Sequence, residues 1–110
     1  MERVTLFHFE DEEILIDIQL YFNEKDQLYF DGCDIGKRVK EIWGDSDYEY
    51  TYTIEPDEVN KMYSLLHVST GNRLDLLLAI QKNFSGNDAY SKFGEFLNGN
   101  NIKYEGFTWA

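Results

Sequence analysis

The segment over residues 44–55 (GDSDYEYTYTIE) alternates strictly between two kinds of side chain in its second half. One side of the extended chain carries Tyr48, Tyr50, Tyr52 and Ile54, and the other carries Asp47, Glu49, Thr51, Thr53 and Glu55. Alternation of this kind indicates a half-buried strand, because successive side chains point to opposite faces. Tyrosine and threonine also favour strands. The segment therefore predicts a strand with three aromatic rings toward a core, and with carboxylates and hydroxyls toward water or a partner.

Four other segments are expected to form strands. Residues 13–22 show the clearest alternation, with every second residue from Ile14 to Phe22 apolar. Residues 4–9 place Val4, Leu6 and His8 on one side, and Thr5, Phe7 and Phe9 on the other. Residues 27–31 and 102–109 complete the set, and polar turns favour hairpins between the first three strands.

Helical spacing of apolar residues replaces the alternation in four segments. Asp34, after a turn at residues 31–34, is expected to cap a short helix over 35–43, since a carboxylate can accept from the free N–H groups of a first turn. Residues 55–58 (EPDE) begin a second helix, because proline fits the first turn and carboxylates favour the positive end of the helix dipole. Two more helices are predicted over 74–84, largely buried, and over 89–97.

The expected order is β-β-β-α-β-α-α-α-β within a single domain, residues 1–110. Strands grouped early and helices grouped late indicate an α+β fold. We expect a mostly antiparallel sheet of about five strands, with three to four helices packed on one face. The position and direction of the last strand are left open.

The chain is strongly acidic, with a formal net charge of −11 from 21 acidic and 10 basic residues. Residues 1–60 hold 17 of the acids and 5 of the bases, so the whole excess lies in this half. Such a field repels nucleic acid and anionic membranes and speeds encounter with basic partners. Solubility alone is an equally good explanation of a high net charge.

The expected cellular location follows from three features that the sequence lacks. The longest apolar run, residues 76–80, is too short to cross a bilayer. The N-terminus lacks the pattern of a secretory signal peptide. The only cysteine, Cys33, excludes an internal disulfide. We expect a cytoplasmic protein.

The sequence contains no complete catalytic or metal-binding motif. Residues 45–56 superficially resemble a calcium loop, but Tyr50 and Pro56 stand where that motif needs glycine and glutamate. The two histidines, His8 and His67, are expected to be structural. Acidic neighbours should raise the pKa of the Cys33 thiol and so disfavour a nucleophile. We therefore expect no enzyme, no cofactor and no metal site, and a small-molecule ligand is not favoured.

Binding of another protein remains the best expectation. Aromatic anchors among carboxylates suit a strongly basic partner. The tyrosines of residues 48–52 and Trp43 are expected more in the core than at an interface, so the carboxylates between them are the better candidates. The candidate partner-binding residues are Asp45, Asp47, Glu49, Trp43, Asp31, Asp34 and Glu12.

A resemblance to a known family rests on short motifs at residues 34–36 (DIG), 43–50 (WGDSDYEY), 96–97 (FL) and 101–105 (NIKYE), and on Trp109. With them the chain resembles small acidic bacterial immunity proteins, of the kind encoded beside polymorphic or contact-dependent growth inhibition toxins. The resemblance implies a cytoplasmic inhibitor of a cognate basic toxin domain, often a nuclease. No contact residue carries over from it.

Two other classes of function stay open. A phage-type nucleic-acid mimic that blocks a host DNA-binding enzyme would need the same acidic surface. A small enzyme or ligand carrier would need a deep pocket lined by His8, Cys33 or His67.

Overall fold

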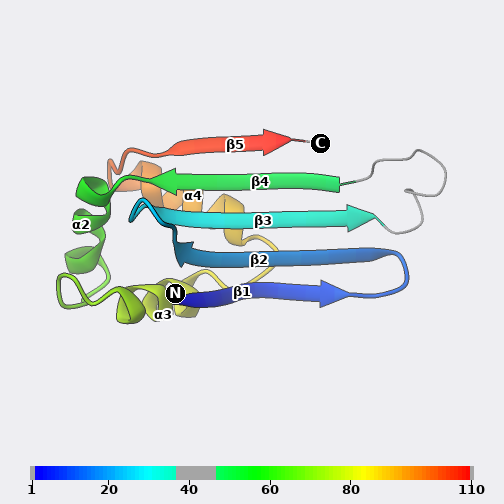
Figure 1. Cartoon of the computed structure of the whole chain (residues 1–110), viewed down its shortest axis with the longest axis horizontal. Helices are drawn as coiled ribbons and strands as arrows, with labels where there is room; N and C mark the ends of the chain where they lie inside the picture. Colours follow the sequence, from blue (N-terminus) through cyan, green and yellow to red (C-terminus); the bar gives the residue numbers. More distant parts are fainter. Residues whose placement is uncertain (1, 37–46, 110) are drawn as a thin grey trace.

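The structure, a computed structural model, describes residues 2–36 and 47–109. Within these residues a five-stranded antiparallel sheet runs in sequence order from β1 to β5. The helices α3 and α4 lie behind this sheet and α2 lies at one end of it (Figure 1). The elements are β1 (Arg3–Glu10), β2 (Ile14–Phe22), β3 (Leu28–Gly36), β4 (Asp47–Ile54), α2 (Pro56–Leu65), α3 (Arg73–Asn83), α4 (Ala89–Gly99) and β5 (Glu105–Trp109). The α+β class is confirmed, and no described helix is long and apolar enough to cross a membrane.

The last strand, β5, adds to the sheet beside β4. Its pairing is antiparallel and runs from Thr53↔Glu105 to Glu49↔Trp109. Each strand therefore pairs with the strand that precedes it in the sequence. The alternation alone could not predict this placement, because a period of two fixes the faces of a strand but not its neighbour.

Aromatic rings join the sheet to α4. Phe30 on β3 stacks on Phe93 with 5.6 Å between ring centroids, and Tyr52 on β4 stacks on Tyr90 at 4.1 Å. The Tyr52 hydroxyl donates a hydrogen bond of 2.9 Å to the Tyr90 carbonyl oxygen. A Cβ atom on Gly94 would lie 2.3 Å from this hydroxyl, so glycine at 94 allows the close approach.

Strand β3 continues where the sequence predicts a turn and a helix start. Gly32 and Asp34 lie within β3, which reaches Gly36, so the expected turn over 31–34 and the cap at Asp34 are wrong. Asp34 instead accepts a hydrogen bond of 2.6 Å from the Tyr50 hydroxyl of β4. Strand pairing satisfies the backbone of these residues, which removes the need for a helix. The rest of the helix expected over 35–43 lies outside the described residues.

A β-bulge corrects the expected faces of β1. Thr5 pairs with Gln19, but Phe7 pairs with Ile18, so β1 contains one extra residue. A bulge of this kind reverses the alternation beyond it. His8 therefore lies on the face away from the helices, and Phe7 and Phe9 lie on the helix side.

Two helices end in a left-handed residue that is not glycine. His67 follows α2 with φ 58°, and Asn101 follows α4 with φ 55°. After α2, the N–H groups of His67 and Val68 donate to the carbonyls of Ser64 and Tyr63. This pattern is a Schellman motif, which satisfies the last carbonyls of a helix. The backbone of His67 therefore has a structural role.

The helices cover only part of the sheet face that they pack on. Tyr50 and Tyr52 are buried as expected, but Tyr48 is 41% exposed and the expectation for its ring is wrong. Alternation predicts the side of a residue and not how far a covering layer extends.

The helix α3 is less buried than expected, because Leu74 and Leu78 are exposed.

Candidate functional site

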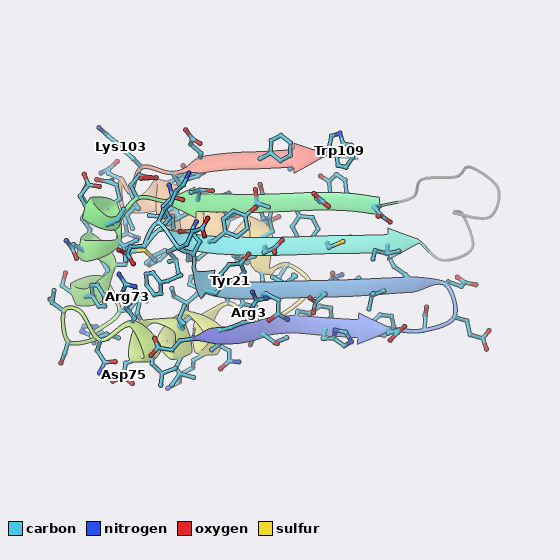
Figure 2. All side chains as sticks on the ribbon, in the orientation of Figure 1. Arg3, Tyr21, Arg73, Asp75, Lys103 and Trp109 are labelled. Atoms are coloured by element: carbon cyan, nitrogen blue, oxygen red, sulfur yellow. The ribbon has the colours of Figure 1, made fainter. Side chains whose placement is uncertain are left out.

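The sheet face opposite the helices, here called the open face, is the candidate site. Pairing and alternation assign to it Arg3, Thr5, His8 and Glu10 of β1; Leu15, Asp17, Gln19 and Tyr21 of β2; Tyr29, Asp31, Cys33 and Ile35 of β3; Asp47, Glu49, Thr51 and Thr53 of β4; and Glu105, Phe107 and Trp109 of β5. No described helix lies in front of this face (Figure 1). Figure 2 shows Arg3 and Tyr21 on β1 and β2, and Trp109 at the end of β5.

Negative charge dominates the open face. Its carboxylates are Glu10, Asp17, Asp31, Asp47, Glu49 and Glu105, and Arg3 is its only lysine or arginine among the described residues. Charges gathered on one surface create a stronger local field than the same charges spread over the molecule. The open face therefore concentrates part of the acidic excess that the sequence locates in residues 1–60.

The polar groups on the β1–β2 side of the open face already hold partners within the chain. Gln19 donates hydrogen bonds to Thr5 Oγ1 at 2.9 Å and to Asp17 Oδ1 at 3.0 Å. His8 Nδ1 lies 3.1 Å from the same Asp17 oxygen. These side chains hold one another in place across β1 and β2.

The β4–β5 side of the open face is different. Glu49 lies directly opposite Trp109, and Phe107 lies opposite Thr51. Trp109 is 53% exposed and Phe107 is 57% exposed. Within residues 2–36 and 47–109, the Glu49 carboxylate makes no hydrogen bond or ion pair and the two rings make no ring contact. Exposed aromatic rings beside a carboxylate are features of an interface anchor.

Cys33 lies at the centre of the open face, between Asp17 and Glu49 in the pairing. Burial, and then the carboxylates of Asp47 and Glu49, raise the pKa of its thiol. The sequence prediction of a raised pKa is confirmed, with burial as the larger cause. Because the thiolate is the reactive form, this environment disfavours nucleophilic chemistry at Cys33.

The candidate residues from the sequence divide into four groups. Asp31, Asp47 and Glu49 lie together on the open face. Glu12 lies in the exposed turn between β1 and β2. Asp34 is on the opposite face, where it accepts the Tyr50 hydrogen bond, so it does not share a surface with these residues. Trp43 and Asp45 lie outside the described residues.

Sequence reasoning missed the two exposed rings of β5. Residues 105–109 (EGFTW) do alternate, with Glu105, Phe107 and Trp109 on one side. That signal predicts that the three side chains share a face. It could not show that this face is the open one, since the choice depends on pairing with β4.

Two features of the described residues bear on the enzyme and ligand-carrier alternatives: the absence of a metal-binding cluster and the lining of two cavities. No group of three or more His, Cys, Asp or Glu side chains in the described parts of the chain could hold a metal ion. A cavity of about 590 Å³ beside α4 is lined by Lys82 and Lys92 among others, and one of about 340 Å³ by Glu58 and Lys103 among others. Neither cavity is lined by a histidine or by the cysteine, so neither supports the enzyme or ligand-carrier alternative.

Comparisons with protein-family models, with curated proteins and with solved structures give no significant match to this chain. The open face is therefore the feature of the molecule that bears on its function.

Proposed function

We propose that this protein binds and neutralises a basic toxin domain, and so acts as the immunity protein of a bacterial toxin. The observation that carries the proposal is the concentration, among the described residues of the open face, of six carboxylates against one arginine, beside two exposed aromatic rings. Complementary charge steers the encounter of two proteins, and aromatic anchors contribute most of the binding free energy once water is displaced.

A nuclease is the toxin class that we favour. A nuclease binds a polyanion through a basic cleft, because contacts to phosphate dominate nucleic-acid affinity. The carboxylates of the open face would occupy such a cleft in place of phosphate, or lie against its rim. In either arrangement the toxin could not engage its substrate, and the inhibitor would need no chemistry of its own.

The proposal is tested first by capture. The tagged protein is used to isolate partners from the native organism, and bound proteins are identified by mass spectrometry. The expected partner is a basic toxin domain whose expression kills cells that lack this protein. Capture of a host DNA-binding enzyme instead would contradict the proposal and support the nucleic-acid mimic.

The second test locates the site. A variant with Asp47→Asn, Glu49→Gln and Glu105→Gln removes three carboxylates from the open face. The matched control removes three exposed carboxylates of α2, of α4 and of the N-cap position before α4, with Asp57→Asn, Glu95→Gln and Asp88→Asn. Both variants carry the same net charge.

Association with the captured toxin is measured by surface plasmon resonance at several salt concentrations. We expect the open-face variant to associate about tenfold more slowly than the parent at low salt, and the control to change about twofold or less. Equal slowing in both variants would assign the effect to net charge and not to the open face. Thermal unfolding of each variant confirms that the fold is retained.

A further inference from the structure

The pair formed by Glu49 and Trp109 is the most specific feature of the open face. The two residues lie directly opposite each other on β4 and β5. Side chains in such a pair have Cβ atoms only about 4.5–5.5 Å apart. A flat apolar ring and a carboxylate are therefore presented together to whatever approaches this side of the face.

The same face shows how such a combination holds a cation. The Arg3 guanidinium carbon lies 4.0 Å from the centroid of the Tyr21 ring. The Tyr21 hydroxyl in turn donates a hydrogen bond of 3.3 Å to Asp31 Oδ2. On the β1–β3 side, an arginine of this chain thus already packs on an aromatic ring that has a carboxylate beside it. Figure 2 shows Arg3 and Tyr21 together there, apart from Trp109.

From this arrangement we infer that Trp109 and Glu49 form a seat for an arginine side chain of the basic partner, in preference to lysine. The inference rests on the proposed function, and it specifies arginine as the side chain of the toxin that the open face recognises. No arginine or lysine of the described residues packs on the Trp109 ring. Within residues 2–36 and 47–109, the seat is therefore not taken by a cation of the chain itself.

Arginine fits this seat better than lysine for two reasons. Its guanidinium is planar and weakly hydrated, so it can stack on an indole ring while its edge N–H groups donate to a carboxylate. The lysine ammonium is compact and strongly hydrated, and it interacts with the carboxylate mainly as a point charge. Phe107, next to Trp109 on the same side of β5, extends the apolar surface beside the seat.

Charge argues against the other occupants. A second copy of this chain would bring the same acidic face, and like charges across an interface are strongly unfavourable. Nucleic acid would be repelled for the same reason. An arginine-bearing surface of a basic protein is the occupant that satisfies both the ring and the carboxylate.

Two short synthetic peptides of equal length provide the probe, one alternating serine with arginine and the other serine with lysine. Their affinities are measured by calorimetry in about 0.15 M salt, where long-range attraction is weakened. We expect the arginine peptide to bind about threefold to tenfold more tightly than the lysine peptide. We also expect it to shift the NMR signal of the Trp109 indole N–H.

Variants identify the cause of this preference. Trp109→Ala should lower the affinity of the arginine peptide to nearly that of the lysine peptide, with little effect on the latter. The control Phe9→Ala removes an exposed ring from the other face of the sheet and should preserve the ratio. Glu49→Gln should weaken both peptides.

Three results would overturn the inference: equal affinity of the parent for both peptides, equal weakening of both by Trp109→Ala, or no binding of either peptide. None of these results bears on whether the chain neutralises a toxin, which is decided by the capture experiment. Failure of that capture with a preserved arginine preference would contradict the proposed function alone.

Discussion

The ring of Tyr50 lies over Gly32 of the neighbouring strand. The two residues are direct partners in the pairing of β3 and β4, and a Cβ atom on Gly32 would lie only 2.0 Å from the Tyr50 ring. From this position the Tyr50 hydroxyl reaches Asp34, two residues further along β3. One tyrosine thus explains both a glycine in the middle of a strand and an aspartate on the helix side of the sheet.

The first prediction concerns this packing. Gly32→Ala forces the Tyr50 ring to move, and we expect it to lower the free energy of unfolding by about 1–3 kcal/mol. The control is Gly99→Ala in α4, where an added Cβ meets nothing within 4 Å. This control should be neutral or slightly stabilising, because alanine favours a helix by up to about 1 kcal/mol over glycine. Urea unfolding measures both, and an unaffected Gly32→Ala variant would show that the ring does not require the glycine.

The second prediction is a coupling between Gly94 and Tyr52. Gly94→Ala should be destabilising because its Cβ would collide with the Tyr52 hydroxyl, whereas the ring carbon bearing that hydroxyl is 3.2 Å away. In a Tyr52→Phe background the closest clash is removed and the ring carbon needs only a small shift, so the same change should be less harmful. A double-mutant cycle by urea unfolding should give a coupling free energy of about 0.5–3 kcal/mol. Additive effects of the two changes would contradict the contact.

The third prediction is a loss of stability at alkaline pH. Burial, and then the hydrogen bond to Asp34, raise the pKa of Tyr50 above its ordinary value of 10.0. Burial also raises the pKa of Tyr52, Tyr63 and Tyr90. The folded state therefore keeps protons that the unfolded state releases above about pH 10.

The sign of this effect follows from proton binding. Stability from these tyrosines is fully present below the unfolded pKa and is lost as the pH rises through the folded value. Urea unfolding between about pH 8 and pH 11 should show a falling free energy of unfolding, with a shallower fall in Tyr50→Phe. Identical slopes in the parent and this variant would argue against a raised pKa at Tyr50.

The fourth prediction concerns the reactivity of Cys33. Since burial and nearby carboxylates raise its pKa, alkylation by iodoacetamide near neutral pH should be slower than that of an unstructured cysteine peptide. Urea should remove this difference, and Glu49→Gln should increase the rate in the folded protein. Faster reaction in the folded state than in urea would instead indicate an activated thiol, and would revive a catalytic role for this residue.

Several features follow from the sequence alone, because they depend on neighbouring residues only. The alternation over residues 13–22 and 47–54 predicts β2 and β4 and separates the buried Tyr50 and Tyr52 from the exposed Glu49. The proline at 56 marks the start of α2, and α3 and α4 follow the apolar spacing closely. The acidic excess is also a property of the sequence.

Other features depend on contacts between segments that are distant in the sequence. Aspartate is a residue type favoured at helix N-caps, but Asp34 lies in a strand. Its environment is determined by pairing with β4 and by the hydrogen bond from the Tyr50 hydroxyl. The bulge in β1 moves His8 to the open face, since its register is decided against β2. No local pattern contains this information.

The candidate site divides in the same way. The sequence determined that Asp47 and Glu49 face away from the buried tyrosines, because side chains alternate along any strand. Only the tertiary structure placed β5 beside β4, and with it Trp109 opposite Glu49. Strand pairing is a long-range choice made by the packing of whole faces, so the seat proposed for arginine exists only once the chain has folded.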